Sequence, residues 1–297
     1  MKNSLKKITC GLLSVVSIIA SAGCSQSAGS GNNSGTAPTE VKTSSSFKGN
    51  TEDVTLEKGD TYAIIKIKDF GEVKCKLFPE AAPKGVSNFI ELAESGYYTN
   101  KKIHRVIENF MLQGGSANGD GMSTADDPQF GVEYNQKMRH YYGALCYANG
   151  GGVNGSQFYI INNKGCGEFT DASYYESAIK QYESYVEQLE ELVKNSTSDD
   201  ERAYYQQLLV SYKNQKEIFE MSKKAIGDCT DEMKERYEKV GGYPFLDGGY
   251  TVFGQVVEGF DVIDSISAVD VVENSSGEKS LPIEDIIIES VTIGTVE

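Results

Sequence analysis

"KIHRVIENFMLQGG", from Lys102 to Gly115, joins two short strand-like runs to an uncommon set of side chains. One cation, Arg105, lies close in sequence to an apolar pair and an amide: Phe110, Met111 and Gln113. No nucleophile, and no acid or base with a clear partner, accompanies them. The stretch therefore predicts β structure that carries a binding surface with one fixed donor, and it does not indicate a site that breaks covalent bonds.

The flanking sequence continues the β pattern. Residues 61–78 alternate apolar and polar side chains on both sides of Asp69, which predicts a hairpin. Residues 83–96 have apolar side chains at helical spacing between Pro83 and Gly96, residues suited to a helix start and a helix end. Further strand-like runs follow at 141–149, 156–162, 250–257 and 283–293. One more helix-like run lies at 259–269. The pattern predicts a mainly β fold, a closed barrel capped by two helices.

Residues 170–240 interrupt this pattern, because they contain no strand signal. Apolar side chains recur there at helical spacing, namely Ile179, Tyr182, Val186, Leu189, Val193, Tyr205, Leu208, Leu209 and Tyr212. Ser173 with Glu176, and Ser198 with Glu201, match the capping-box pattern of a helix start. The segment predicts an antiparallel helical hairpin and a short third helix at 232–239, inserted into the β domain.

The N-terminal residues have the features of an export signal. Three lysines precede an apolar run at 8–20 that is too short to span a bilayer permanently. "SAGC" then leads into Cys24 and resembles a bacterial lipobox, with Ser21 in the place of the usual leucine. A plain secretory signal over residues 1–23 is the alternative. We expect lipidation at Cys24 and anchoring at the extracytoplasmic face of a bacterial cell membrane. Residues 24–54, rich in Ser and Gly, predict a flexible tether.

The composition argues against some partners and sites. A formal net charge of −15 argues against nucleic acid, whose phosphates are neutralised by Lys and Arg. The chain has only two histidines and no cysteine spacing typical of zinc, so we expect no metal, and His104 is interpreted as a core residue. Cys75 and Cys146 lie in strand-like runs, as small core side chains do. Cys166 and Cys229 flank the helical segment, and the sequence leaves open whether they form a disulfide.

Three motifs, "IHRVIENFMLQGG", "YANGGGVNGSQFYI" and "FLDGGYTVFGQVVEGFDVI", together resemble the cyclophilins, a family of peptidyl-prolyl cis/trans isomerases. The resemblance covers the chain from about residue 61 to its C-terminus, apart from the helical insertion. It implies an eight-stranded barrel over residues 55–297, interrupted by 170–240. It also implies isomerase activity on proline-containing unfolded or exported polypeptides, without a cofactor, by a monomer.

The resemblance also implies roles for single residues. Arg105 would be the catalytic arginine, and Gln113 would orient that arginine and the substrate backbone. The expected substrate-binding residues are Phe110, Met111, Ala148, Asn149, Gln157, Tyr159, Phe245, Leu246 and Tyr250. Tyr159, Phe245 and Tyr250 stand where many family members have phenylalanine, tryptophan and histidine, and the glycine loop after Asn149 is one residue shorter.

The residue types suit rotation about an X–Pro bond. That rotation meets a barrier of about 18–20 kcal/mol, because amide resonance is lost in the twisted state. An apolar slot for the proline ring and a fixed donor that favours the twisted amide would lower the barrier. Arginine suits the donor role because it is always charged and holds its donors in a rigid plane.

Two alternatives remain open at this point. The chain is either an isomerase that assists the folding of exported proteins or a non-catalytic peptide-binding or chaperone module on the same fold. The tyrosines of the insertion either pack its helices together or contact client chains; they are Tyr174, Tyr175, Tyr182, Tyr185, Tyr204, Tyr205 and Tyr212.

Overall fold

The structure of the chain is a computed structural model, and it describes residues 37–122 and 128–297. The expected export signal, the expected lipid site at Cys24 and the first part of the expected tether lie outside the described residues. No helix in the described ranges is long and apolar enough to cross a membrane.

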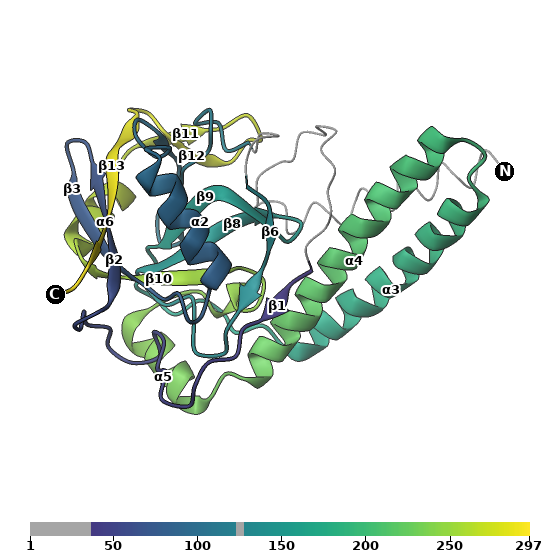
Figure 1. Ribbon diagram of the computed structural model, residues 1–297, viewed down its shortest axis with the longest axis horizontal. Helices are drawn as coiled ribbons and strands as arrows, with labels where there is room; N and C mark the ends of the chain where they lie inside the picture. The colour runs from purple at the N-terminus through teal and green to yellow at the C-terminus, as the bar shows by residue number, and fades with distance from the viewer. Residues whose placement is uncertain (1–36, 123–127) are drawn as a thin grey trace.

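Eight antiparallel strands form a closed barrel, which confirms the predicted fold class (Figure 1). Neighbouring strands pair in the order β5-β4-β13-β2-β3-β10-β8-β9, and β9 pairs with β5 to close the ring. The strands are β2 (Thr61–Ile67), β3 (Gly71–Leu77), β4 (Lys102–Ile107), β5 (Met111–Gly114), β8 (Ala144–Gly150), β9 (Val153–Ile161), β10 (Val252–Glu258) and β13 (Ile286–Thr295). β6 (Phe130–Gly131) adds a short pairing to β9.

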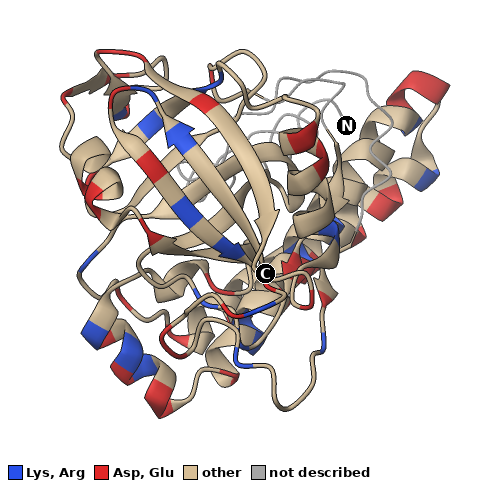
Figure 2. Cartoon of the chain, turned by 60° about the vertical axis from the view of Figure 1, so that its left-hand side comes forward, with Lys and Arg blue, Asp and Glu red and all other residues tan. Residues whose placement is uncertain are grey.

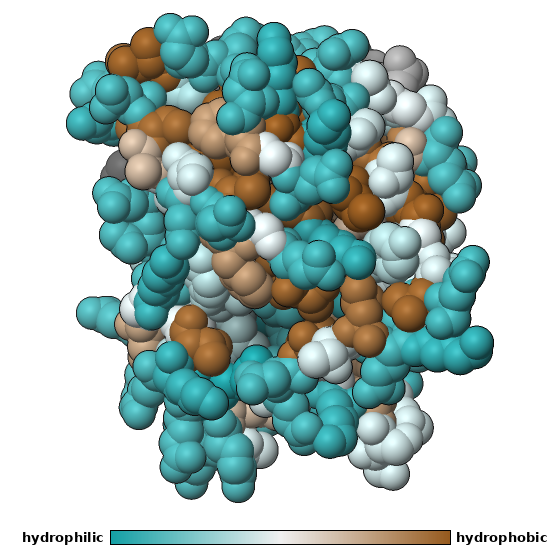
Figure 3. All heavy atoms as spheres, turned by 90° about the vertical axis from the view of Figure 1, so that its left-hand side faces the viewer, coloured by the Kyte–Doolittle hydropathy of each residue, from teal (hydrophilic) through white to brown (hydrophobic). Residues whose placement is uncertain are grey.

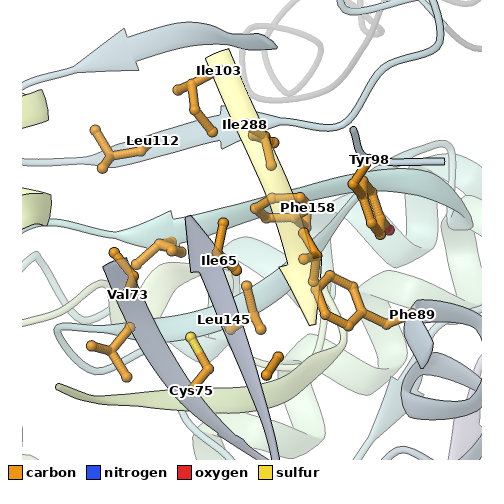
Figure 4. Packing of buried hydrophobic residues seen from close by; sticks show 14 of the residues in the cluster. Ile65, Val73, Cys75, Phe89, Tyr98, Ile103, Leu112, Leu145, Phe158 and Ile288 are labelled. Carbon is orange, nitrogen blue, oxygen red and sulfur yellow. The ribbon is translucent and has the colours of Figure 1, made fainter. Parts of the chain in front are cut away.

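The period-2 alternation of the strands separates a barrel interior from an outer site. Leu112 joins the interior cluster, whereas its neighbour Met111 belongs to a second cluster outside the barrel. Figure 4 shows the interior, where side chains from many strands meet. α2 (Pro83–Glu94) and α6 (Phe260–Ser267) pack against the same interior cluster through residues such as Phe89 and Ile263.

Glu133, on the short strand β7 (Glu133–Tyr134), caps α2 from outside the helix. Its buried carboxylate accepts from the backbone N–H groups of Lys84 and Gly85 at 3.1 and 2.8 Å. The helix has no side-chain cap of its own at Ala82. Burial raises the pKa of Glu133, and the two backbone donors oppose that shift.

The insertion consists of α3 (Ala172–Asn195), α4 (Asp199–Gly227) and α5 (Asp231–Val240). Figure 1 shows α3 and α4 as a hairpin that extends away from the barrel. The predicted cap at Ser198 is present, because its hydroxyl accepts from the N–H of Glu201 at 3.2 Å. The predicted cap at Ser173 is wrong: Asp171 is the N-cap, and its carboxylate accepts from the N–H of Ser173 at 2.7 Å.

Most of the tyrosines of the insertion lie between its helices. Tyr175, Tyr182 and Tyr212 are buried in a cluster with Leu189 and Phe219, and the rings of Tyr182 and Tyr212 are 5.4 Å apart. Tyr185 and Tyr205 pack against this cluster. This packing favours the interpretation that the tyrosines hold the hairpin together; Tyr174 and Tyr204 are exposed.

Residues 37–54 differ from the expected flexible tether, because they pack on the domain. β1 (Thr39–Glu40) runs parallel to β7 and pairs with it. Asn50 is fully buried: it donates to the backbone oxygen of Arg139 at 2.8 Å and accepts from the same residue's N–H at 2.8 Å. The Ser-rich composition predicts a tether, but side-chain and backbone hydrogen bonds to distant strands order the segment.

The surface carries interspersed charges of both signs. Figure 2 shows acidic and basic residues interspersed on strands and helices, and Lys66 of β2 pairs with Glu289 of β13 at 2.9 Å. Figure 3 shows the face farthest from the hairpin, where polar side chains separate the apolar patches. Such a surface is ordinary for a globular domain.

Candidate active site

Pairing across the barrel wall aligns Arg105, Gln113, Tyr159 and Cys146. Arg105 of β4 lies opposite Gln113 of β5, Gln113 lies opposite Tyr159 of β9, and Tyr159 lies opposite Cys146 of β8. Directly opposite residues of antiparallel strands point to the same face. The strand register therefore brings residues from four strands into one row on the outside of the barrel.

A one-way line of hydrogen bonds crosses this row. Arg105 donates from Nη1 to Oε1 of Gln113 at 3.1 Å, and Gln113 donates from Nε2 to Oε1 of Gln157 at 3.1 Å. Gln157 then donates to the backbone oxygen of Gly121 at 3.1 Å. Both glutamine side chains are buried, so each has a defined orientation.

An apolar cluster of side chains, the expected proline pocket, lies beside this line. Its buried members include Met111, Ala148, Tyr159 and Leu246, and the half-buried rings of Phe110 and Tyr250 pack against them. The ring of Phe110 also packs edge-on against Tyr243, with centroids 4.9 Å apart, and lies 5.9 Å from Cζ of Arg105. The structure thus places the guanidinium of Arg105 beside a set of large apolar side chains.

Asn149 holds the two loops at the other edge of the pocket. Its side chain donates to the backbone oxygen of Gly249 at 3.0 Å and accepts from the N–H of Gly152 at 3.1 Å. Of the expected site residues, Phe245 is the one set apart, because its ring is exposed on the short helix η2 (Pro244–Leu246). Its backbone oxygen accepts from the hydroxyl of Tyr175 on α3 at 3.2 Å.

The insertion touches the pocket loop directly. Gly248 has a φ of +79°, and a Cβ there would lie 2.6 Å from the backbone oxygen of Met221 on α4. Beside it, the buried carboxylate of Asp247 accepts from Arg139, from the N–H and Nδ1 of His140 and from the hydroxyl of Tyr237, at 2.8–3.2 Å. Arg139 also donates to the backbone of α4 at Ala225. The pocket wall at Leu246 is therefore fixed to α4 and α5.

Glu278 was not expected from the sequence, and it binds the guanidinium of Arg105. Nε donates to Oε1 and Nη2 donates to Oε2, both at 2.7 Å, in a two-pronged ion pair. The side chains are 12% and 26% exposed. Burial alone would raise the pKa of Glu278, but hydrogen bonds from Arg105 and Ser280 and the charge of Arg105 hold it below its usual range.

Tyr159 and Cys146 form the buried floor beneath the pocket. Burial raises the pKa of both groups well above the ordinary value. The partner of the Tyr159 hydroxyl is the thiol of Cys146, and a thiol is a weak hydrogen-bonding group. The polar atom that Tyr159 has and phenylalanine lacks is therefore poorly satisfied.

One histidine and two cysteines that the sequence singled out lie outside this row of residues. His104 is buried, and burial lowers its pKa to about 4, which agrees with its interpretation as a core residue. Cys166 and Cys229 are free thiols, so the disulfide that the sequence left open is not formed. Within residues 37–122 and 128–297, no group of three or more His, Cys, Asp or Glu side chains is arranged to hold a metal.

Comparison with known proteins identifies similar sequences and folds. The family profile described as "Cyclophilin type peptidyl-prolyl cis-trans isomerase/CLD" matches residues 62–214 and 237–293. A protein of Staphylococcus saprophyticus subsp. saprophyticus, named as a peptidyl-prolyl cis-trans isomerase, is 30% identical over 239 residues, 79% of this chain and 93% of the relative. A namesake from Staphylococcus epidermidis is 30% identical over 75% of this chain and 87% of its own length.

Solved structures of a Cryptosporidium parvum cyclophilin type peptidyl-prolyl cis-trans isomerase are also similar. One covers 80% of this chain and 99% of its own, with 20% identity and a TM-score of 0.48. A second, determined in the presence of the dipeptide Ala-Pro, covers 79% of this chain with 20% identity and a TM-score of 0.47.

Proposed function

The chain belongs to the cyclophilin-type peptidyl-prolyl cis-trans isomerases, and we propose that it isomerises X–Pro bonds at the site around Arg105. The observation that carries this proposal is the line from Arg105 through Gln113 to Gln157 beside an apolar cluster. The line supplies a fixed donor, and the apolar side chains would contact the proline ring.

The proposed mechanism is differential stabilisation of the twisted amide. As the bond rotates, resonance is lost and the prolyl nitrogen gains a lone pair, which a guanidinium N–H can meet. The pocket of Met111, Leu246 and the ring of Phe110 holds the proline ring while the rest of the peptide turns. Ala148 and Asn149 lie along the edge where the substrate backbone would pair, as the family pattern implies. No covalent bond breaks, so no nucleophile or proton transfer is needed.

The test is isomerisation of an Ala-Pro peptide, followed by NMR exchange between its cis and trans signals. The protein begins at Ser25, so that every described residue is retained. We expect cis/trans exchange to be much faster than the uncatalysed reaction, which takes tens to hundreds of seconds. A folded protein that leaves the exchange rate unchanged would refute isomerase activity.

A second candidate is a peptide-binding module without catalysis, and the ion pair between Arg105 and Glu278 is the observation that favours it. A guanidinium engaged by a carboxylate is a weaker partner for a developing lone pair. The same NMR experiment separates the two candidates. Line broadening of the peptide signals without faster exchange would support binding alone.

We also propose export and lipid anchoring, which rest on the first 24 residues of the sequence. A prolyl isomerase outside the cytoplasm would speed a step of exported-protein folding that is otherwise slow. Labelling of bacterial cells with a clickable fatty acid tests the anchor. The Cys24→Ala variant should lose both the label and the membrane association, whereas Cys10→Ala should keep them. Label retained by Cys24→Ala would refute the anchor.

A further inference from the structure

We propose that Glu278 is a positioning residue for Arg105, whose carboxylate fixes the guanidinium in the orientation used to stabilise the twisted amide. This inference rests on the proposed isomerase function of the Arg105 site. Glu278 lies 173 residues from Arg105 in the chain, in the hairpin formed by β11 (Val271–Glu273) and β12 (Lys279–Pro282).

Three side chains contact the guanidinium of Arg105. The carboxylate of Glu278 accepts from Nε and Nη2 at 2.7 Å each, and Gln113 accepts from Nη1 at 3.1 Å. The ring centroid of Phe110 lies 5.9 Å from Cζ. Two parallel N–H···O bonds set rotation as well as position, which a single contact cannot do. Without the carboxylate, the guanidinium would lose both of these parallel bonds.

Glu278 is itself held by the turn between β11 and β12. Its backbone N–H donates to Oδ1 of Asn274 at 3.0 Å, and its backbone oxygen accepts from the N–H of Asn274 at 2.8 Å. Ser280, almost fully buried, contributes a hydrogen bond to the carboxylate. The strand β12 packs along β4, which carries Arg105. The hydrogen bonds of this turn and the packing of β12 on β4 therefore hold the carboxylate of Glu278 beside Arg105.

This support distinguishes positioning from inhibition. A carboxylate that blocked the arginine would have to leave before each turnover, and it would be expected on a segment that can move away. Glu278 instead lies on a hydrogen-bonded turn anchored to the barrel. A hydrogen-bond donor stabilises the transition state most when it is already correctly oriented before the reaction. The structure thus favours an ion pair that persists during catalysis.

The experiment compares Glu278→Gln, Glu278→Ala and Glu278→Asp with the wild type by steady-state kinetics on one Ala-Pro peptide. We expect kcat to fall about 10- to 100-fold in the Gln and Ala variants while KM changes little, because a misplaced arginine affects the transition state most. The Asp variant should recover part of the loss. Glu273→Gln, at an exposed carboxylate of the same hairpin, is the matched control and should behave as the wild type.

A second readout follows the guanidinium without using activity. In ¹⁵N NMR of the wild type, the Nε–H of Arg105 should be protected from exchange and its Nη groups should rotate slowly. Glu278→Gln should lose both features while the melting temperature and circular dichroism stay close to wild type. Free rotation of the Arg105 guanidinium in the wild type would overturn the inference.

These measurements distinguish failure of the positioning role of Glu278 from failure of the isomerase function. An active wild type with an equally active or faster Glu278→Gln variant overturns the positioning role alone, and a faster variant identifies the carboxylate as a competitor of substrate. An inactive wild type overturns the proposed isomerase function, and the positioning role falls with it.

Discussion

Gln113 donates from its side-chain amide to Oε1 of Gln157 at 3.1 Å, and this bond sets the direction of the whole line at the site. Because the nitrogen of Gln113 faces Gln157, its oxygen faces Arg105 and accepts from the guanidinium. The two glutamines thus connect the guanidinium of Arg105 to the backbone oxygen of Gly121.

Removal of the Gln113 amide should therefore weaken catalysis. We expect Gln113→Leu to lower kcat/KM by roughly tenfold to a hundredfold, because Arg105 loses one restraint. The free energy of unfolding should fall by about 1–3 kcal/mol, since Gln157 loses a buried partner. Peptide kinetics and urea unfolding measure the two effects. Gln255→Leu is the control, because Gln255 is also buried and hydrogen-bonded. This variant should lose a similar amount of unfolding free energy and keep its kcat/KM.

Tyr159 offers the opposite case, a buried polar atom whose removal should do no harm. Its hydroxyl has the weakly hydrogen-bonding thiol of Cys146 as its partner, and apolar side chains such as Met111 and Leu246 belong to the same cluster. Tyr159→Phe should leave the melting temperature unchanged or raise it, and kcat/KM should be kept or increased. A loss of several degrees or of activity would show that the hydroxyl has a partner that matters.

The contact between the insertion and the pocket loop can be measured at Gly248. Gly59→Ala, a control with a φ of +89° and nothing within 4 Å of the added Cβ, should cost about 1–2 kcal/mol of unfolding free energy. Gly248→Ala has the same backbone cost, and the clash with the backbone of α4 should add about 1–3 kcal/mol. Urea unfolding gives both values. Equal costs would mean that α4 does not press on this loop.

His104 predicts a pH dependence of stability. Its pKa is lowered from 6.5 to about 4 by burial, so the folded chain keeps it neutral while the unfolded chain protonates. The free energy of unfolding is therefore unaffected by this residue above pH 6.5 and falls as the pH drops from 6.5 to 4, by about 3 kcal/mol in all. Urea unfolding at pH 7 and pH 4.5 should show a smaller loss for His104→Asn than for wild type. An identical loss in both proteins would contradict the assignment.

The barrel and the order of the site motifs could be predicted from the sequence because both depend on local pattern. Alternation in residues 61–78 marks β2 and β3, and Pro83 and Gly96 bound α2 within two residues. The short connection between β4 and β5 then sets the register of this hairpin, in which Arg105 lies opposite Gln113.

Contacts between distant polar segments were not predictable in this way. Glu278 lies in a turn of charged and small residues that indicates a loop, and nothing local shows that its carboxylate meets Arg105. Residues 37–54 have the composition of a tether, yet Asn50 is buried through hydrogen bonds to Arg139 and Gln255. Both contacts depend on the tertiary fold, which brings together groups that have no periodic signal.

The most direct test of the account is the comparison of Arg105→Ala and Arg105→Lys with the wild type on one Ala-Pro peptide. Removal of the donor should lower kcat/KM by roughly 10²- to 10³-fold with circular dichroism unchanged. Lysine should restore little, because it keeps the charge but cannot hold the two-pronged bond to Glu278 and the bond to Gln113 at once. Wild-type activity that survives in Arg105→Ala would contradict the central claim, since the barrier would then be lowered by something other than this guanidinium.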